Sequence, residues 1–196
     1  MSSPTAAFYF DLASPLAYLA AEQILHVLGG PAEWQPVLAS ELPGSGEPRE
    51  AGISRPELER RAAELALQPL RWPDPFPFDS TLAMRVATYA KSIGRTVPFT
   101  QAAFRQAFAG GHSLQNPDFV LIAAAACEMH PAAVLRGAEM RSVAEQLSAA
   151  TATAAEIGVR DVPCVVVEGQ VFHGASGLQE AAAHMRGATT GGGTKP

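Results

Sequence analysis

The hydrophobic positions of this chain change their spacing several times, and each change marks a different predicted element. Residues 8–12 form a short apolar and aromatic run that suits a buried strand. From residue 16 to residue 28 the apolar positions follow helical spacing, and Ser14 and Pro15 are favoured types for the N-cap and the first helical position. The pattern therefore predicts a strand that runs directly into a helix, with Ser14 at the positive end of the helix dipole.

The middle of the chain is predicted to be helical. A second strand is expected at residues 34–38, and a loop at 43–48, where Gly, Pro and Ser dominate. Helical spacing then continues to residue 157, apart from the proline-rich segment 70–78, which favours an extended path. The expected helices cover residues 54–65, 79–90, 100–108, 119–129, 131–137 and 140–157.

Strand-like residues return near the end of the chain. Residues 162–167 and 170–172 predict two strands joined by a two-residue turn at Glu168 and Gly169. A final helix is expected at residues 178–185, with Ser176 as its N-cap. The Gly- and Thr-rich tail 189–196 is expected to be disordered.

The predicted order of elements is β-α-β, a block of helices, and then β-β-α. This order is that of an α/β, thioredoxin-like fold with an all-helical insertion. The predicted domains are a thioredoxin-like domain made of residues 1–53 and 158–188 and an inserted helical domain at residues 54–157.

Composition excludes several classes of function. The chain has 196 residues, 47% of them hydrophobic, and a net charge of −5, which suits one domain with a full core and argues against nucleic acid or an anionic membrane as a partner. We expect no signal peptide, and no window reaches the roughly 18 apolar residues of a membrane span. The two cysteines, Cys127 and Cys164, lie far apart and form no Cys-x-x-Cys pair, so we expect no metal site, no disulfide framework and a cytoplasmic location.

Four stretches resemble the 2-hydroxychromene-2-carboxylate isomerases, close relatives of the kappa-class glutathione transferases in the thioredoxin-like disulfide-oxidoreductase superfamily. The first is the opening Phe-Tyr-Phe-Asp-x-x-Ser-Pro-x-x-Tyr-Leu-Ala, and the others are residues 71–73 with 76–80, residues 158–163 and residues 172–178. With the helical block between them, the resemblance spans residues 6–186. It implies glutathione as cofactor, a small aromatic or unsaturated substrate, and a homodimer.

Ser14 is the catalytic candidate. In the redox relatives a Cys-x-x-Cys occupies the positions of residues 14–17, so its absence here rules out dithiol–disulfide exchange from this site. A serine hydroxyl at a helix N-terminus can donate a hydrogen bond to a thiolate. Lowering a thiol pKa from about 8.5 by about two units needs roughly 2.7 kcal/mol, which one charge-assisted hydrogen bond and the helix end can supply. The resemblance implies that the thiol is glutathione's; the alternative is that Ser14 is only an N-cap.

Val162 and Pro163 resemble the cis-proline dipeptide that faces the active site in thioredoxin-like folds. There the residue before proline offers its backbone to a peptide-like ligand in the manner of an added strand. We expect the cis isomer, while a trans proline at a strand start is the alternative. Cys164 follows and is expected within reach of Ser14 as a substrate-binding thiol, or else as a small buried hydrophobe.

The γ-glutamyl side of the implied glutathione site is altered. In the family, this turn holds this end of glutathione and usually has an Asp near the position of Ser176 or Gly177, followed by Arg, and both are missing here. The turn is therefore either a weakened glutathione site or a simple helix cap. Asp79 stands where the isomerases tend to have Asn, and it either repels an anionic substrate, supplies a partner for an ammonium group, or caps a helix.

The resemblance also suggests substrate-binding residues: Pro15, Tyr18, Arg71 and Trp72, of which Arg71 suits a carboxylate. A solvated arginine beside a packed tryptophan is the alternative for Arg71 and Trp72. Three hypotheses follow for the function. The first is a glutathione-dependent isomerase or transferase, the second a thioredoxin-like binding module without turnover or redox chemistry, and the third a transferase that uses another low-molecular-weight thiol.

Overall fold

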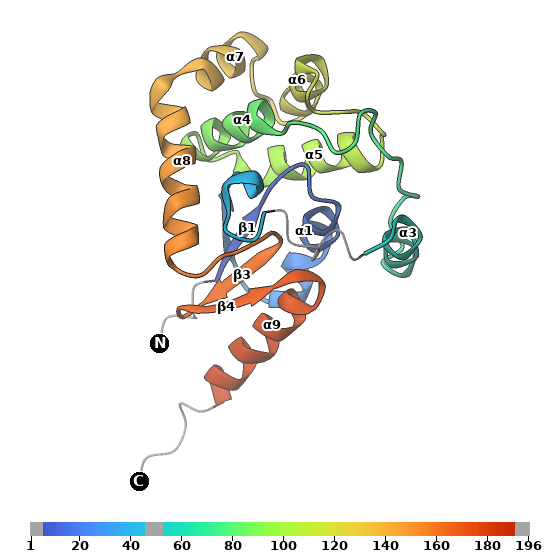
Figure 1. Ribbon diagram of the computed structural model, residues 1–196, viewed down its shortest axis with the longest axis vertical. Coiled ribbons are helices and arrows are strands. Elements are labelled where there is room, and N and C mark those ends of the chain that lie inside the picture. The colour runs from blue at the N-terminus through green and yellow to red at the C-terminus, as the bar shows by residue number, and fades with distance from the viewer. Residues whose placement is uncertain (1–5, 46–52, 191–196) are drawn as a thin grey trace.

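The computed structural model describes residues 6–45 and 53–190 and contains a four-stranded sheet with the order β2-β1-β3-β4 (Figure 1). Strands β1 (Ala6–Phe10) and β2 (Ala32–Pro36) are parallel and are joined by helix α1 (Pro15–Leu28). Strand β3 (Cys164–Val167) pairs antiparallel with β1 and with β4 (Gln170–His173). The predicted β-α-β and β-β-α units therefore form one sheet.

Helices surround this sheet. In Figure 1 helices α4 to α7 lie above it, α8 runs along one side, α3 stands on the opposite side, and α9 lies below. The remaining elements are η1 (Ala39–Glu41), α3 (Arg55–Glu64), α4 (Thr81–Ser92), α5 (Thr96–Phe108), α6 (Pro117–Ala125), α7 (Pro131–Glu139), α8 (Arg141–Glu156) and α9 (Gly174–Thr190).

One aromatic core joins the sheet to the helical block. The rings of Phe8 and Phe10 on β1 contact Trp34 on β2, with centroids 5.1 and 6.0 Å apart. Phe10 also contacts Phe104 on α5, with centroids 6.1 Å apart. All four side chains are buried. The helices inserted in the sequence thus bury their apolar faces on the same core as the first strand.

The hairpin and the second strand test the sequence predictions. Glu168 and Gly169 form the predicted two-residue turn, and both have positive φ angles, 50° and 82°. This is the backbone of a primed hairpin turn, so that prediction is confirmed. Strand β2 runs from Ala32 to Pro36 rather than over residues 34–38, because its register places Pro36 opposite Phe10, the last residue of β1.

The last helix differs most from its prediction. Helix α9 begins at Gly174, one turn before the expected start at residue 178, and continues to Thr190. Gly174 has a φ of 72°, which lets the chain turn directly from β4 into the helix. Ser176 therefore lies inside the first turn, and its predicted role as the N-cap is wrong. Residues 189 and 190 of the expected disordered tail are helical, and residues 191–196 lie outside the described residues.

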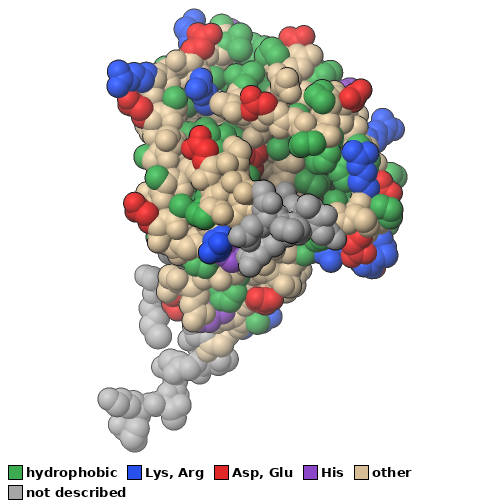
Figure 2. Space-filling view, in the orientation of Figure 1, with side chains coloured by type: hydrophobic (Ala, Val, Ile, Leu, Met, Phe, Trp, Pro, Cys, Tyr) green, Lys and Arg blue, Asp and Glu red, His purple; other side chains and the backbone are tan. Residues whose placement is uncertain are grey.

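The surface carries charges of both signs. On the face shown in Figure 2, acidic and basic side chains are interspersed rather than gathered by sign. Among the residues that the structure describes, no helix has the length and apolar character needed to cross a bilayer. Within the same residues, no group of three or more His, Cys, Asp or Glu side chains could hold a metal ion.

Candidate functional site

Ser14 caps helix α1 as its sequence predicts. Its backbone is extended, with φ −90° and ψ 114°, and its Oγ accepts a hydrogen bond from the Ala17 N–H at 3.1 Å. Pro15 occupies the first helical turn, where the missing N–H is harmless. The Ser14 residue is only 2% exposed. The site is thus a buried, well-formed helix end whose dipole favours negative charge.

Asp11, three residues before Ser14, is a site residue that sequence reasoning missed. Its Oδ1 accepts from the Ala13 N–H and its Oδ2 from the Ala39 N–H, both at 2.9 Å, and the Ser80 hydroxyl also bonds to it. Burial raises the pKa of Asp11, while these hydrogen bonds act in the opposite direction. The carboxyl ties the β1–α1 turn to η1 and α4. The only sequence signal for this role of Asp11 is that it is an acidic residue directly after a buried strand.

A cavity of about 510 Å³ opens beside Ser14 and is called here the Ser14 cavity. Its volume falls within the range of about 300–1,000 Å³ typical of small-molecule sites. Its walls come from β1–α1, η1, α3 and the segment 72–80. The lining residues include Asp11, Ser14, Pro15, Arg55, Leu58, Trp72, Phe76, Phe78, Asp79 and Ser80. Four of the predicted site residues, Ser14, Pro15, Trp72 and Asp79, therefore meet in one place.

Trp72 and Arg55 form the aromatic wall of this cavity. The guanidinium carbon of Arg55 lies 4.6 Å from the centroid of the Trp72 ring and 5.8 Å from that of Phe76. The indole N–H of Trp72 donates to Glu59 Oε1 at 2.9 Å, so α3 is fixed over the wall. In the described part of the chain, no carboxylate pairs with Arg55. A cation stacked on aromatic rings thus faces the cavity without a counter-ion from these residues.

Arg71 does not line the Ser14 cavity, so this expectation is not met. Its side chain is exposed, and its backbone N–H donates to the Phe108 carbonyl at 2.8 Å. In the extended segment 70–78, Trp72, Phe76 and Phe78 face the cavity and Arg71 does not. Arg55, which sequence reasoning did not select, occupies the position expected of Arg71.

Asp79 lines the cavity but also caps helix α4. Its Oδ1 accepts from the Thr81 N–H at 2.8 Å and from the Thr81 hydroxyl at 2.6 Å. These two hydrogen bonds lower the pKa of Asp79. The geometry matches the capping alternative for this residue.

Tyr18 lies outside the Ser14 cavity, contrary to the expected substrate contact. It comes one helical turn after Ser14 and stacks on Phe108, with ring centroids 5.7 Å apart. Burial raises the pKa of Tyr18 to about 12. The residue borders a separate cavity of about 450 Å³, which Glu22 and Arg105 also line. Its side of α1 faces α5 instead of the substrate wall.

The peptide bond between Val162 and Pro163 is cis, as predicted. Val162 lines a hollow of about 300 Å³ that Leu16, His173 and Gly174 share. Pro163 lines a second hollow of about 250 Å³, between α1, α3 and α9. The two hollows adjoin because both contain Leu16 and Ala175, and together they are called the cis-proline groove. Ile53 belongs to both the groove and the Ser14 cavity, so the two sites are neighbours.

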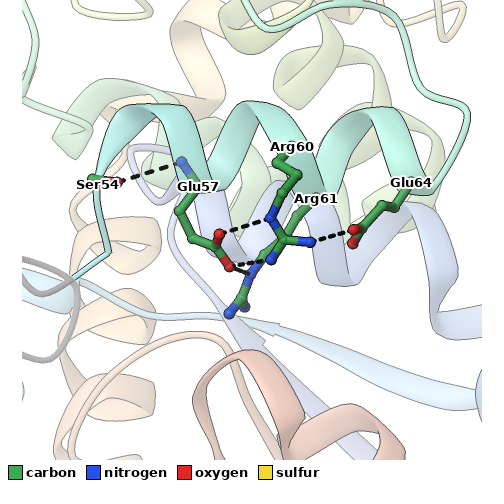
Figure 3. A network of polar contacts seen from close by, with 5 residues as sticks. All are labelled: Ser54, Glu57, Arg60, Arg61 and Glu64. Carbon is green, nitrogen blue, oxygen red and sulfur yellow. Dashed lines mark hydrogen bonds and ion pairs between the residues drawn. The ribbon is translucent and has the colours of Figure 1, made fainter.

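Arg61 on α3 reaches the groove from the opposite side. Its Nε donates to Glu57 Oε1 at 2.7 Å, and the side chain points away from Glu64 (Figure 3). Glu57 also accepts hydrogen bonds from Nη2 and Nε of Arg60, at 2.7 and 2.9 Å. The other terminal nitrogen of Arg60, Nη1, donates to Glu64 Oε1. This network braces Arg61 beside Pro163 and beside the shallow hollow that Ser176 lines.

The start of α9 places Ser176 and Gly177 in different environments. Ser176 is exposed. Gly177 is buried and lines none of the hollows described above, which does not fit its predicted cofactor contact. A Cβ atom at Gly177 would lie 2.7 Å from the Phe172 carbonyl oxygen, closer than real Cβ contacts. The backbone here leaves no room for a side chain at position 177.

Cys164 is a core residue. It is 1% exposed and packs with Val37, Val159 and Val162 in a second, smaller core cluster. Burial raises the pKa of the Cys164 thiol to about 12, so this thiol stays protonated near neutral pH. It lines neither the Ser14 cavity nor the cis-proline groove. The expected substrate contact is not met, and the alternative of a small buried hydrophobe fits.

Comparison with solved structures supports the fold. A 2-hydroxychromene-2-carboxylate isomerase superposes with a TM-score of 0.84 at 16% identity, covering 95% of this chain and 97% of that one. A protein described as a probable DsbA oxidoreductase from Streptomyces coelicolor gives 0.78 at 17% identity, covering 98% and 92%. The cytosolic disulfide reductase DsbM from Pseudomonas aeruginosa, solved with GSH, gives 0.65 at 12% identity, covering 95% and 98%. At these identities the likeness shows a shared fold.

Sequence comparison identifies the family. No curated protein matches the chain. Residues 5–186 match the family described as the DSBA-like thioredoxin domain, which is nearly the whole chain. The protein therefore belongs to the DsbA-like thioredoxin family.

Proposed function

We propose that this DsbA-like protein is a thiol-dependent isomerase or transferase in which Ser14 holds a thiolate beside the aromatic cavity. One observation carries the proposal. Ser14 begins helix α1 and lines a cavity of about 510 Å³, next to the groove of the cis proline. This is the family's redox position, but without cysteines its chemistry must act on a thiol from outside the chain.

Ser14 can bind a thiolate because of how its hydroxyl is placed. A hydroxyl group has one proton to donate and two lone pairs. The Ser14 oxygen accepts the Ala17 N–H with one lone pair, and we propose that its O–H proton turns to a bound thiolate. A sulfur anion at this place gains a charge-assisted hydrogen bond and the positive end of the α1 dipole. Together these effects can lower a thiol pKa by about two units, equivalent to roughly 2.7 kcal/mol.

The Ser14 cavity suits a planar, electron-poor substrate with a carboxylate. Trp72 and Phe76 offer apolar ring surface, and Arg55 offers a guanidinium group to a carboxylate. A bound thiolate supplies a nucleophile that can add reversibly to an unsaturated bond and so allow rotation about it. The residues of the chain orient the substrate between Ser14 and Arg55 and keep water away from the buried helix end.

Glutathione, the thiol that the resemblance implies, fits this site only at its sulfur end. Ser14 and the adjoining groove suit a thiol group. The γ-glutamyl end lacks its expected charged partners, because Ser176 is uncharged and Gly177 has no space for a side chain. We therefore propose a small thiol as the class of ligand that Ser14 binds, and the proposal does not require this thiol to be glutathione.

Calorimetric titration with reduced thiols tests the proposal. A thiol should bind the wild type and lose most of its affinity in Ser14→Ala, while Ser176→Ala, at the other helix start, serves as the matched control. Turnover of a hydroxychromene carboxylate, followed by absorbance, should be lost in Ser14→Ala and weakened in Arg55→Leu more than in Arg55→Lys. If neither thiol binding nor turnover depends on Ser14, the proposal is wrong.

A second candidate function is a thioredoxin-like binding module without turnover. The close approach of the Phe172 carbonyl to Gly177 favours this candidate. It excludes a side chain that would contact the γ-glutamyl group, and a site without such cofactor contacts can still bind a ligand. Ligand binding that is equal in wild type and Ser14→Ala, with no turnover, would support this candidate. We also propose the homodimer that the resemblance implies, and sedimentation equilibrium of the full chain tests it.

A further inference from the structure

The cavity that Tyr18 borders, called here the Tyr18 cavity, has no part in the proposed thiol chemistry. It has a volume of about 450 Å³ and lies between helices α1 and α5 and the segment 66–68 that follows α3. This volume suits a small molecule. Helix α5 contributes one face of the cavity, made of Ala102, Arg105, Gln106 and Ala109. The cavity shares no lining residue with the Ser14 cavity or with the cis-proline groove.

Tyr18 brings a hydroxyl group without a partner to this cavity. The residue is only 2% exposed, and its ring packs on Phe104 and Phe108, with centroids 6.0 and 5.7 Å away. Among the residues that the structure describes, none forms a hydrogen bond with the hydroxyl. Burial raises the pKa of this hydroxyl, Glu22 raises it further and Arg105 lowers it, so the hydroxyl lies on the side of these two cavity residues. A hydroxyl held this deeply normally has a hydrogen-bond partner, which a ligand in the cavity can supply.

Glu22 lies one turn after Tyr18 on the same face of α1, and Arg105 holds it in place. Its side chain is 10% exposed. Its Oε1 accepts from Arg105 Nε at 2.7 Å, and its Oε2 accepts from Arg105 Nη2 at 2.8 Å. A carboxylate has about four acceptor positions, so about two remain for a ligand. The ion pair leaves this wall of the cavity with no net charge, and it places an acceptor beside the Tyr18 hydroxyl.

We propose that the Tyr18 cavity binds a small, planar, neutral ligand that carries an amide group. The amide oxygen accepts a hydrogen bond from the Tyr18 O–H, and the amide N–H donates to the Glu22 carboxylate one turn along α1. The apolar part of the ligand packs against Leu67 and Ala109. A charged ligand is disfavoured, because an anion meets Glu22, a cation meets Arg105, and either one loses its hydration in the cavity.

Three probes of the same shape and different charge test the proposal. Benzamide is neutral, benzoate is an anion and benzamidinium is a cation. In a nuclear magnetic resonance titration of the full chain, benzamide should bind with a Kd of about 1 mM, and the two ions at least about fivefold more weakly. The backbone amide signals that shift most should be those of Leu67, Ala102 and Ala109, and those of Ser14 and Trp72 should stay unchanged.

Two substitutions test the two polar contacts. Tyr18→Phe removes only the hydroxyl and should weaken benzamide binding by about tenfold, while the melting temperature stays unchanged because no described residue bonds to that hydroxyl. Tyr89→Phe makes the same change on α4, outside the cavity, and should bind benzamide as the wild type does. Glu22→Gln leaves Arg105 without its counter-ion, so this variant should bind benzoate at least about fivefold more tightly than the wild type.

Several results would overturn the amide site, and none of them bears on the thiol site. Benzamide binding that is undiminished in Tyr18→Phe is one, and wild-type binding of benzoate or benzamidinium as tight as that of benzamide is another. Signal shifts centred on Ser14 and Trp72, or no benzamide binding at about 10 mM, also overturn it. Ser14→Ala should bind benzamide as the wild type does, and a loss of binding in that variant would contradict a separate site.

Discussion

The two places where a strand runs directly into a helix are built in different ways. At the β1–α1 junction, Ser14 caps the helix and Asp11 holds three segments together from a buried position. At the β4–α9 junction the helix begins on Gly174 with a positive φ, and Ser176 is exposed on its first turn. The first junction has the buried cap on which the proposed thiolate site depends. The second has no such cap, so the same strand-to-helix connection is made in this chain by two different local structures.

Removing the Asp11 carboxylate is expected to have the largest effect. Asp11→Ala leaves the Ala13 and Ala39 N–H groups without their acceptor, and each unsatisfied group costs about 1–3 kcal/mol. We expect the free energy of unfolding in urea to fall by about 3 kcal/mol in total. Asp118→Ala, in the first turn of α6, should change it by about 0.5 kcal/mol or less.

The Asp11 carboxyl also gives the first junction a characteristic pH dependence. Its pKa is higher in the folded chain than in the unfolded one, because burial disfavours the charge. The folded state thus holds its proton longer, so this contribution to stability is full below the unfolded pKa of about 3.9 and declines as pH rises through the raised value. Stability that rises with pH over this window more steeply in wild type than in Asp11→Asn would contradict the assignment.

A substitution at Gly177 is expected to disrupt the second junction. A methyl group there meets the Phe172 carbonyl at 2.7 Å, so Gly177→Ala should lower the free energy of unfolding by about 1–3 kcal/mol. Gly187→Ala is the matched control on the same helix, because nothing lies within 4 Å of its Cβ position. There the better helix propensity of alanine should leave stability equal or raise it by up to about 1 kcal/mol. Equal effects from both substitutions would show that α9 does not pack on β4 as described.

The two serines give a smaller contrast. Ser14→Ala removes the hydrogen bond to the Ala17 N–H and should cost about 1 kcal/mol of unfolding free energy, typical of a lost N-cap. Ser176→Ala removes an exposed hydroxyl inside the first turn and should stay within about 0.5 kcal/mol of wild type. Thermal unfolding followed by circular dichroism measures both, and a larger loss in Ser176→Ala would reverse the comparison.

The smallest effect is expected at Glu57, which braces Arg61 beside the second junction. Its hydrogen bonds from Arg60 and Arg61 lower the pKa of Glu57 to about 2. A lowered pKa contributes stability above the unfolded pKa of about 4.3, and this contribution is lost as pH falls toward 2. The pair is exposed, so Glu57→Gln should be nearly neutral at pH 7 and in high salt. A large loss of unfolding free energy in Glu57→Gln at pH 7 would contradict this expectation and would mean that the contacts of Glu57 with Arg60 and Arg61 stabilise the fold.

Much of the fold could be predicted because its elements have local signals. The spacing of apolar residues after Ser14 and the turn at Glu168 and Gly169 depend on neighbours within a few positions. Sequence spacing missed the start of α9, because helical and turn conformations are both open to the residues after Gly174. The close approach of Gly177 to Phe172 is visible only when β4 and α9 pack together.

The site was predicted less completely, since its contacts join distant segments. Ser14 and the cis isomer at Pro163 followed from a motif. Asp11 needs Ala39 and Ser80 as partners, and no local pattern brings these together. The direction of a side chain in the irregular segment 70–78 cannot be read from residue type, so Arg71 was chosen in place of Arg55. Cys164 is expected at the site because it follows the cis proline, and Tyr18 because the resemblance implies it, but both side chains are buried in the core.

The packing of Gly177 limits how this protein could be redesigned. Grafting the family's acidic and basic residues onto positions 176 and 177 is a change of two side chains, but the Phe172 carbonyl occupies the space that the second one needs. A designer would first have to shorten α9 by its opening turn, by replacing Gly174 and rebuilding the path out of β4. Recognition of the γ-glutamyl end in this scaffold is therefore a problem of backbone engineering, and point substitutions at these two positions alone should not improve the affinity for glutathione.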